Sequence, residues 1–254
     1  MKIAVCVKQV PEGTKRLDPG TKRLDRSGEG TLNPFDANAV EEALRVKERT
    51  GEGDVVVVTM GPPAAADALR KALAMGADRA VHVADEQAAG SDLVATSRVL
   101  AAALAREEAE LVLFGQQSAD SDGAVLWAAV AERLGQPVIS QVAELAVESG
   151  KVRGKRQTEF GYDVIEAPLP AVVAVSDAVN EPRYPSLKGI MGAKKKPQEQ
   201  LSLSDLGVDA AGEAGSKTTV LALSEPPARG ESRRVEEGDA AEQIVAFLEE
   251  KRLL

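Results

Sequence analysis

Short runs of consecutive apolar, mostly β-branched residues alternate with longer stretches of helical periodicity along the first half of the chain. The apolar runs span residues 3–7, 54–59, 80–83 and 111–114. Runs of this kind are typical of parallel strands that are buried on both faces. Their alternation with helical segments predicts an α/β fold built on a doubly wound, mostly parallel sheet.

The helical segments between these runs have recognisable ends. Small polar residues or proline are common at the start of a helix, and glycine is common just after its end. The expected helices begin at Asp36, Pro62, Ser91 and Asp122, and Gly76 and Gly135 end the second and the fourth. In such a fold, ligands bind at the carboxyl ends of the strands.

The second half of the chain follows a different pattern. Alternating apolar and polar positions on both sides of residues 148–150 predict a β-hairpin. Further extended segments are expected at residues 162–166 and 171–175, and residues 180–197 read as irregular and basic.

From residue 199 onward the chain is polar and poorly suited to forming a core alone. Its pattern predicts a strand at residues 218–223 and a helix with Ile244, Val245 and Leu248 on one face. We therefore expect one α/β domain at residues 1–198 and a C-terminal arm at residues 199–254 that packs on a partner.

Composition excludes several functional classes. One cysteine, Cys6, and one histidine, His82, cannot form most zinc sites, a cysteine-ligated iron–sulfur cluster or an intrachain disulfide. Both lie in apolar strand patterns, which favours structural roles. With 31 basic against 40 acidic residues and 3% aromatics, the chain is not expected to bind nucleic acid. No apolar run reaches the roughly 20 residues of a membrane span, and no signal peptide precedes the first strand. These features predict no membrane insertion and a cytoplasmic location, or the mitochondrial matrix in a eukaryote.

The expected strand at residues 111–114 leads into a loop of small and polar residues, 115–125, and then into a helix. The free amides and the positive dipole end of such a helix favour a phosphate group. Gly115 and Gly123 permit close approach of a ligand to the backbone. The pattern is neither a Walker A loop nor G-x-G-x-x-G, so a capped strand–helix loop without a ligand is the alternative.

The polar side chains of this loop suit the rest of a nucleotide. Ser118 and Ser121 can donate hydrogen bonds to phosphate or ribose oxygens. Asp120 and Asp122 fit as acceptors for ribose hydroxyls or as caps of the following helix.

A second loop, Asn33-Pro34-Phe35-Asp36, precedes the first helix. Pro34 holds Asn33 extended, and Asp36 is expected to cap the helix. Alone, this segment reads as a capping turn. However, it would lie at the same end of the sheet as residues 115–125, and a nucleotide pocket requires two converging loops.

Residues 180–191 combine prolines with apolar side chains, in a segment expected to be neither a regular helix nor a central strand. The apolar side chains are Tyr184, Leu187, Ile190 and Met191, and the cations that follow include Lys194 and Lys195. An apolar patch bordered by cations is typical of a docking surface for an acidic partner. A solvated loop with a basic tail is the alternative.

Together these segments resemble the beta subunit of electron-transfer flavoproteins, over nearly the whole chain. The resemblance rests on residues 5–10, 33–35, 72–79, 115–122 and 169–173. Its strongest part is Asn180-Glu181-Pro182-Arg183-Tyr184, followed by Leu187, Ile190, Met191 and the lysines. Each motif alone is modest, but all of them in this order are highly specific.

The resemblance implies a Rossmann-like, adenine-nucleotide-binding fold with a β-hairpin extension and a C-terminal arm that packs on an alpha subunit. It implies that this subunit binds AMP as a structural nucleotide and that the alpha subunit holds most of the redox-active FAD. The implied AMP pocket comprises Cys6, Asn33, Pro34, Phe35, Asp36, Met60, Gly115, Gln116, Gln117, Ser118, Ala119, Asp120, Ser121, Asp122, Gly123, Ala124 and Val125.

The resemblance also implies an electron carrier rather than an enzyme. The heterodimer would accept electrons from flavin dehydrogenases, such as the acyl-CoA dehydrogenases of fatty acid β-oxidation, and pass them to a membrane quinone oxidoreductase. Leu187 would insert into an apolar pocket of the dehydrogenase, supported by Ile190 and Met191. Gln157 or Glu159 stands where the family has an acidic residue that pairs with the alpha subunit, and Glu159 is preferred.

Two other functions remain open at this point. A bifurcating branch of the family carries a second FAD in place of AMP and usually has threonine after the second aspartate, where this chain has Gly123. A stand-alone adenine-nucleotide-binding domain, similar in fold to universal stress proteins, is the other alternative.

Overall fold

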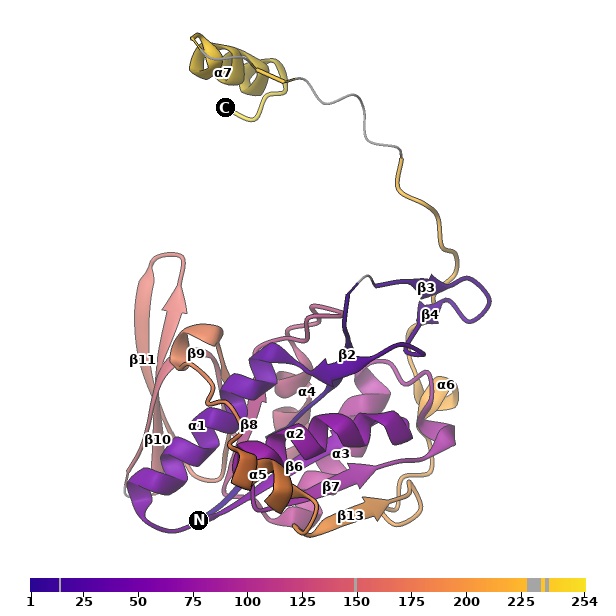
Figure 1. Cartoon of the computed structure of the whole chain (residues 1–254), viewed down its shortest axis with the longest axis vertical. Coiled ribbons are helices and arrows are strands. Elements are labelled where there is room, and N and C mark those ends of the chain that lie inside the picture. The colour runs from indigo at the N-terminus through magenta and orange to yellow at the C-terminus, as the bar shows by residue number, and fades with distance from the viewer. Residues whose placement is uncertain (14, 149, 228–233, 236–237) are drawn as a thin grey trace. The chain divides into compact units, whose positions relative to one another are not determined.

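The computed structural model describes residues 1–13, 15–148, 150–227, 234–235 and 238–254 of the 254-residue chain (Figure 1). These residues form two compact units, Met1–Val220 and Leu221–Leu254. Ser149, in the turn expected at residues 148–150, lies outside the described residues. Among the helices of the described residues, none is long and apolar enough to cross a bilayer.

A nine-stranded sheet forms the centre of the first unit, in the order β11-β10-β9-β12-β8-β1-β6-β7-β13. Its strands are β1 (Lys2–Cys6), β6 (Asp54–Met60), β7 (Arg79–Val83), β8 (Leu111–Gly115), β9 (Val138–Glu148), β10 (Lys151–Thr158), β11 (Gly161–Pro168), β12 (Ala171–Val175) and β13 (Gln198–Leu201). All neighbours from β9 to β13 pair in parallel, whereas β10 and β11 are antiparallel additions beside β9. The expected α/β class with a large, mostly parallel sheet is confirmed.

Helices cover both faces of this sheet (Figure 1). One face carries α1 (Pro34–Thr50), α2 (Ala66–Met75) and α5 (Leu187–Ala193), and the other carries α3 (Leu93–Glu107) and α4 (Leu126–Leu134). The short elements are β2 (Gln9–Pro11), β3 (Leu17–Asp18), β4 (Arg23–Leu24), β5 (Gly30–Leu32), η1 (Pro63–Ala65), η2 (Glu86–Ala88), η3 (Asp177–Val179) and α6 (Gly212–Gly215). β2 pairs with β5, and β3 pairs with β4.

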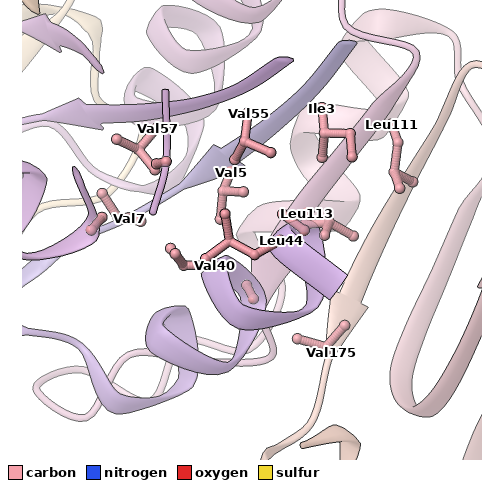
Figure 2. Packing of buried hydrophobic residues seen from close by; sticks show 14 of the residues in the cluster. Ile3, Val5, Val7, Val40, Leu44, Val55, Val57, Leu111, Leu113 and Val175 are labelled. Carbon is pink, nitrogen blue, oxygen red and sulfur yellow. The ribbon is translucent and has the colours of Figure 1, made fainter. Parts of the chain in front are cut away.

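Alternating side chains of the central strands supply two separate cores. Ile3 and Val5 of β1 face α1, where Val40 and Leu44 pack against them (Figure 2). Cys6, from the same strand, points to the opposite core with α3 and α4. Because both faces of each strand are covered, the strands have continuous apolar runs rather than an alternating pattern.

The expected start of the first helix is wrong. α1 begins at Pro34 with Asn33 as its N-cap, and Asp36 lies buried in the first turn. Proline is well suited to the first position of a helix, because it has no amide to leave unpaired there. Asp36 is therefore too far along the helix to cap it.

The starts of two later helices are also corrected. Asp92, rather than Ser91, caps α3, and its Oδ1 accepts a hydrogen bond from the Ala95 amide at 2.9 Å. Asp122 does not cap α4, which begins at Leu126. Asp122 instead has a φ of 48° in a tight turn, and its amide donates to the Ser118 carbonyl at 2.8 Å.

The segment expected to be irregular contains α5. Pro182 and Pro185 precede this helix and do not interrupt it. Ser186 caps it, because its Oγ accepts a hydrogen bond from the Gly189 amide at 3.0 Å. The prolines therefore position the chain before the helix instead of preventing it.

The first part of the polar C-terminal region belongs to the sheet unit. β13 pairs in parallel with β7, and Leu201, Leu203 and Val208 are buried in the core beneath α3. The boundary between compact units consequently falls after Val220, later in the chain than the expected boundary at residues 198/199.

The strand expected at residues 218–223 is absent. Asp92 Oδ2 accepts the amides of Lys217 and Thr218 at 2.6 and 2.9 Å, so these donors are not available to a sheet. In the second unit, the expected helix is present as α7 (Ala240–Glu250).

Candidate functional site

The loop before α1 and the loop after β8 are joined through one buried side chain. Asn33 is fully buried, and its Nδ2 donates a hydrogen bond to the Gln117 carbonyl at 2.9 Å. Its Oδ1 accepts a hydrogen bond from the Ala119 amide at 3.0 Å. The two loops that the sequence suggested would converge therefore do so at the carboxyl end of the sheet.

Gly115 lets these loops approach each other closely. A Cβ at this position would lie 2.5 Å from the Phe35 carbonyl carbon and 2.6 Å from Asp36 Oδ1. These distances are far shorter than any van der Waals contact, so a larger residue would push the loop away from α1. Phe35 itself is half-buried, and Pro34 is exposed.

The Asp36 carboxylate is buried beneath the two loops. Its Oδ2 accepts the Lys8 amide at 2.8 Å, which fixes the end of β1 against α1. Burial raises the pKa of Asp36 to about 7, although hydrogen bonds from Asn33 and the Lys8 amide oppose this rise. Burial, together with the Asp36 carboxylate, also raises the pKa of the Cys6 thiol, which disfavours a nucleophilic role.

Three cations surround the middle of the loop after β8. Lys8 Nζ lies 2.8 Å from Asp120 Oδ1, and Arg26 Nη2 lies 2.5 Å from Asp120 Oδ2. Lys15 Nζ donates to the Ala119 carbonyl. Burial alone would raise the pKa of Asp120, but Lys8 and Arg26 lower it to about 2. Asp120 is thus an ionised anchor for Lys8 and Arg26, not a helix cap.

The end of the loop presents free backbone donors. Among the described residues, the amides of Gly123, Ala124 and Val125 have no hydrogen-bond acceptor. They immediately precede α4, whose dipole is positive at this end. Gly123 has no atom within 4 Å of the position of a Cβ. These amides, and the cations that contact residues 118–121 of the same loop, are groups of the kind that bind phosphate.

The other predicted pocket residues lie around these loops. Ser118 Oγ and Ser121 Oγ are 2.8 Å apart, and both are within 3.5 Å of Lys8 Nζ. The Gln116 carbonyl accepts a hydrogen bond from the Trp127 indole at 3.0 Å, which ties the loop to α4. Met60 is the half-buried last residue of β6, the neighbour of β1 in the sheet.

The predicted docking residues form a separate exposed patch on and before α5. Tyr184 is 92% exposed, Leu187 81%, Met191 75% and Ile190 51%. Their segment contacts α1 near Glu41 and Glu48. Glu41 and Glu48 are about 12 and 22 Å along the helix from Asn33, at about 1.5 Å per residue. The patch and the nucleotide-type loop are therefore distinct sites.

The lysines after this patch do not all face solvent. Lys194 and Lys195 are exposed, as a basic border to the patch requires. Lys196 instead turns toward α2, where its Nζ donates to the carbonyls of Leu73 and Ala77 at 2.9 and 2.6 Å. Burial lowers the pKa of Lys196. This lysine caps the carboxyl end of α2 and holds α5 in place.

Glu159 lies at the turn between β10 and β11, where it is exposed. Gln157, the other candidate, is the penultimate residue of β10 and is also exposed. The neighbouring Phe160 is 98% exposed. This turn therefore leaves a large apolar side chain open to solvent beside Glu159.

Sequence reasoning missed the cations around Asp120. Lys8, Lys15 and Arg26 are roughly a hundred positions away from the loop they contact, and each resembles an ordinary surface residue in the sequence. One signal was present: Asp120 is an acidic residue in a loop suited to an anion, which implies nearby cations.

Comparison with known proteins identifies relatives along the whole chain. A family model described as "Electron transfer flavoprotein domain" matches residues 21–206. "Electron transfer flavoprotein subunit beta" of Mycobacterium tuberculosis is 42% identical over 263 aligned residues, covering 99% of both chains. The subunit of the same name from Clostridium acetobutylicum is 36% identical over the full length of both chains. "Caffeyl-CoA reductase-Etf complex subunit CarD" of Acetobacterium woodii is 39% identical, also over the full length of both.

Proposed function

The chain belongs to the electron transfer flavoprotein family as a beta subunit, and from this premise we propose that it is the AMP-binding, partner-docking half of a heterodimeric electron carrier. In this proposal the alpha subunit holds most of the FAD, which supplies the redox chemistry. Electrons come from acyl-CoA dehydrogenase-type flavoenzymes in the cytoplasm and leave to a membrane quinone oxidoreductase. This chain needs no catalytic acid or base, since its residues bind and orient the other components.

The observation that carries the nucleotide assignment is the donor set at the start of α4. The amides of Gly123, Ala124 and Val125 have no acceptor within the described chain, and Lys8 and Lys15 lie against the same loop. A nucleoside monophosphate would place its phosphate on these amides. Asn33 would act by holding the two loops together.

The docking assignment rests on the exposed patch of Tyr184, Leu187, Ile190 and Met191. A leucine that is 81% exposed at the start of a capped helix is a rigid apolar projection. It suits an apolar pocket on a partner, and Lys194 and Lys195 suit an acidic rim around that pocket.

Two other segments suit contact with the alpha subunit. Glu159 and Phe160 project at the turn of β10 and β11. In the second unit, α7 exposes Ile244, Val245 and Phe247 at 44–48% of their surface, so an apolar helix face is open to a partner.

The nucleotide assignment is tested by counting bound nucleotides. The chain is co-expressed with its alpha subunit, the complex is purified and denatured, and the released nucleotides are identified and counted by mass. One FAD and one AMP per heterodimer support the proposal. ATP or ADP on this chain alone, with no partner retained, would instead indicate a stand-alone nucleotide-binding domain.

A second candidate function is electron bifurcation with FAD in place of AMP. One relative is named as a subunit of a caffeyl-CoA reductase–Etf complex, so a beta subunit can belong to an enzyme complex rather than to a separate carrier. The same measurement separates the two, because this function requires two FAD and no AMP.

The docking assignment is tested with Leu187→Ala. We expect the heterodimer to keep its nucleotides but to show a KM raised about tenfold as electron acceptor for an acyl-CoA dehydrogenase. Leu17→Ala removes a leucine that is 56% exposed elsewhere and serves as the control. An unchanged KM in Leu187→Ala would refute the docking role.

A further inference from the structure

The segment before the proposed docking patch (Tyr184, Leu187, Ile190 and Met191) is attached to α1 by the side-chain amides of Asn38 and Asn180. Asn38 Nδ2 donates to the Asn180 carbonyl at 2.7 Å, and Asn180 Nδ2 donates to the Asn38 carbonyl at 3.1 Å. Asn180 Nδ2 also lies 3.1 Å from Glu42 Oε2. The chain is therefore fixed where it leaves the sheet, seven residues before Leu187.

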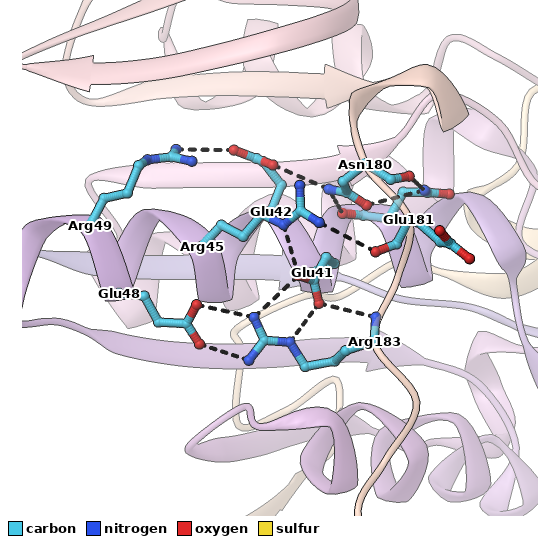
Figure 3. Close-up of polar contacts among 9 residues, drawn as sticks. Glu41, Glu42, Arg45, Glu48, Arg49, Asn180, Glu181 and Arg183 are labelled. Atoms are coloured by element: carbon cyan, nitrogen blue, oxygen red, sulfur yellow. Dashed lines mark hydrogen bonds and ion pairs between the residues drawn. The ribbon is translucent and has the colours of Figure 1, made fainter.

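Arg183 makes a second and stronger attachment (Figure 3). Its Nε and Nη2 lie 2.6 and 3.1 Å from the carboxylate oxygens of Glu41, and its Nη1 and Nη2 lie 2.7 and 3.1 Å from those of Glu48. The Arg183 amide donates to Glu41 Oε2 as well, at 3.2 Å. The guanidinium thus spans two carboxylates that lie seven residues, or about two turns, apart on α1. A lysine cannot reproduce this fork geometry.

The burial of Glu41 makes this attachment specific. Glu41 is 3% exposed, and Arg45 and Arg183 both pair with it. Arg45 reaches only Glu41 Oε1, whereas Glu41 Oε2 accepts from Arg183 Nε and the Arg183 amide. Loss of Arg183 would therefore leave this buried carboxylate oxygen without these donors, which is destabilising. The segment before the patch therefore has one energetically favoured position on α1.

α5 packs directly on α2. A Cβ on Gly189 would lie 2.4 Å from the Ala74 carbonyl oxygen, so the two helices touch through backbone. Lys196 adds its hydrogen bonds to Leu73 and Ala77. Residues 180–183 are held by α1, and α5 packs on α2. The apolar side chains of Tyr184 and Leu187 therefore remain exposed.

We propose that Arg183, through its fork on Glu41 and Glu48, is a positioning residue that holds Leu187 in the orientation a partner recognises. Arg183 lies four residues before Leu187 and ties its segment to α1. The inference rests on the proposed docking function. Arg183 acts on docking through Leu187, so its loss affects binding of the electron donor and not the transfer step.

The experiment uses the purified heterodimer with an acyl-CoA dehydrogenase and its acyl-CoA substrate. Arg183→Gln is expected to raise the KM for the flavoprotein about tenfold, with kcat and the bound nucleotides unchanged. Arg183→Lys, which keeps the charge but not the fork, should fall between this variant and the wild type. Arg106→Gln is the matched control, because Arg106 makes a comparable two-point pair with Glu199 on the other face of the sheet.

A double-mutant cycle separates positioning from general stability. If Arg183 acts through Leu187, Arg183→Gln adds little to the KM of Leu187→Ala. Full additivity, or an unchanged KM in Arg183→Gln, would overturn the inference while leaving the docking function intact. An unchanged KM in Leu187→Ala would instead refute the docking function itself.

Glu48→Gln provides the test if Arg183→Gln does not fold. Glu48 is 58% exposed at its side chain, so its substitution removes the outer arm of the fork without burying an unpaired charge. We expect a smaller rise in KM that again disappears in the Leu187→Ala background. A KM equal to that of the wild type would contradict the inference.

Discussion

Lys8 Nζ lies 2.8 Å from Oδ1 of Asp120, an aspartate whose side chain is completely buried. The pair connects the segment after β1 to the loop after β8. Arg26 pairs with the other carboxylate oxygen of Asp120. The loop thus contains an ionised carboxylate of its own, and this carboxylate holds Lys8 and Arg26 in place.

The stabilisation that Asp120 gives to the folded chain should be lost in acid. With a pKa of about 2, folded Asp120 binds fewer protons than unfolded Asp120 below about pH 4. Its stabilisation is therefore complete above that pH and is lost as the pH falls toward 2. Asp120→Asn should reduce stability at pH 7 by about 2 kcal/mol, and the difference should shrink at pH 3. Thermal unfolding of the heterodimer at both pH values measures this, and an equal difference at both would contradict it.

Asp36 should have the opposite dependence. Its pKa of about 7 means that the folded chain holds a proton that the unfolded chain has released above about pH 4. Asp36 therefore makes the wild type less stable as the pH rises from about 4 through 7. In Asp36→Asn this loss should disappear from the profile of Tm against pH. The exposed Asp209→Asn is the control, whose profile should match that of the wild type.

Gly115→Ala should separate α1 from the loop after β8. The added Cβ overlaps Phe35 and Asp36, and overpacking of this kind costs about 1–3 kcal/mol. We expect a lower Tm and loss of AMP from the purified heterodimer. Gly123→Ala is the control for stability, because that position is open, and its Tm should be close to that of the wild type. Equal Tm values for the two variants would refute the account of Gly115.

Gly189→Ala should displace α5 from α2 and leave the loop after β8 unchanged. Its Cβ would collide with the Ala74 carbonyl oxygen, which cannot move without disturbing α2. The expected result is a raised KM for the acyl-CoA dehydrogenase with full nucleotide content. Gly192 lies in the same helix, and a Cβ at this position would have no atom within 4 Å. Gly192→Ala should therefore leave the KM unchanged. A wild-type KM in Gly189→Ala would show that the packing of α5 on α2 does not matter for docking.

Much of the fold could be predicted because its signals are local. Buried parallel strands such as β6 and β8 have apolar runs that need no knowledge of their neighbours. Helix starts were less predictable, because good capping residues can be used elsewhere. Asp36 makes a long-range contact with the Lys8 amide, and Asp122 lies in a local turn with Ser118. Likewise the amides of Lys217 and Thr218 bind Asp92 instead of a strand.

The candidate site could be predicted only in part, for the same reason. The small and polar loop after β8 and the apolar patch around Leu187 are visible as contiguous segments of sequence. The cations on Asp120 and the fork of Arg183 on Glu41 and Glu48 join residues far apart in the chain. Single-sequence patterns carry no record of such pairs, so their roles emerge only from the fold.

β11 is an edge strand of the sheet. Its residues Tyr162 and Val164 are each more than half exposed. Phe160, 98% exposed, extends this apolar strip to the adjoining turn. An unpaired strand edge bordered by apolar side chains is a template on which other chains can add strands. Synthesis of this chain without a partner should therefore yield aggregates and inclusion bodies, and simultaneous synthesis of the partner should suppress them.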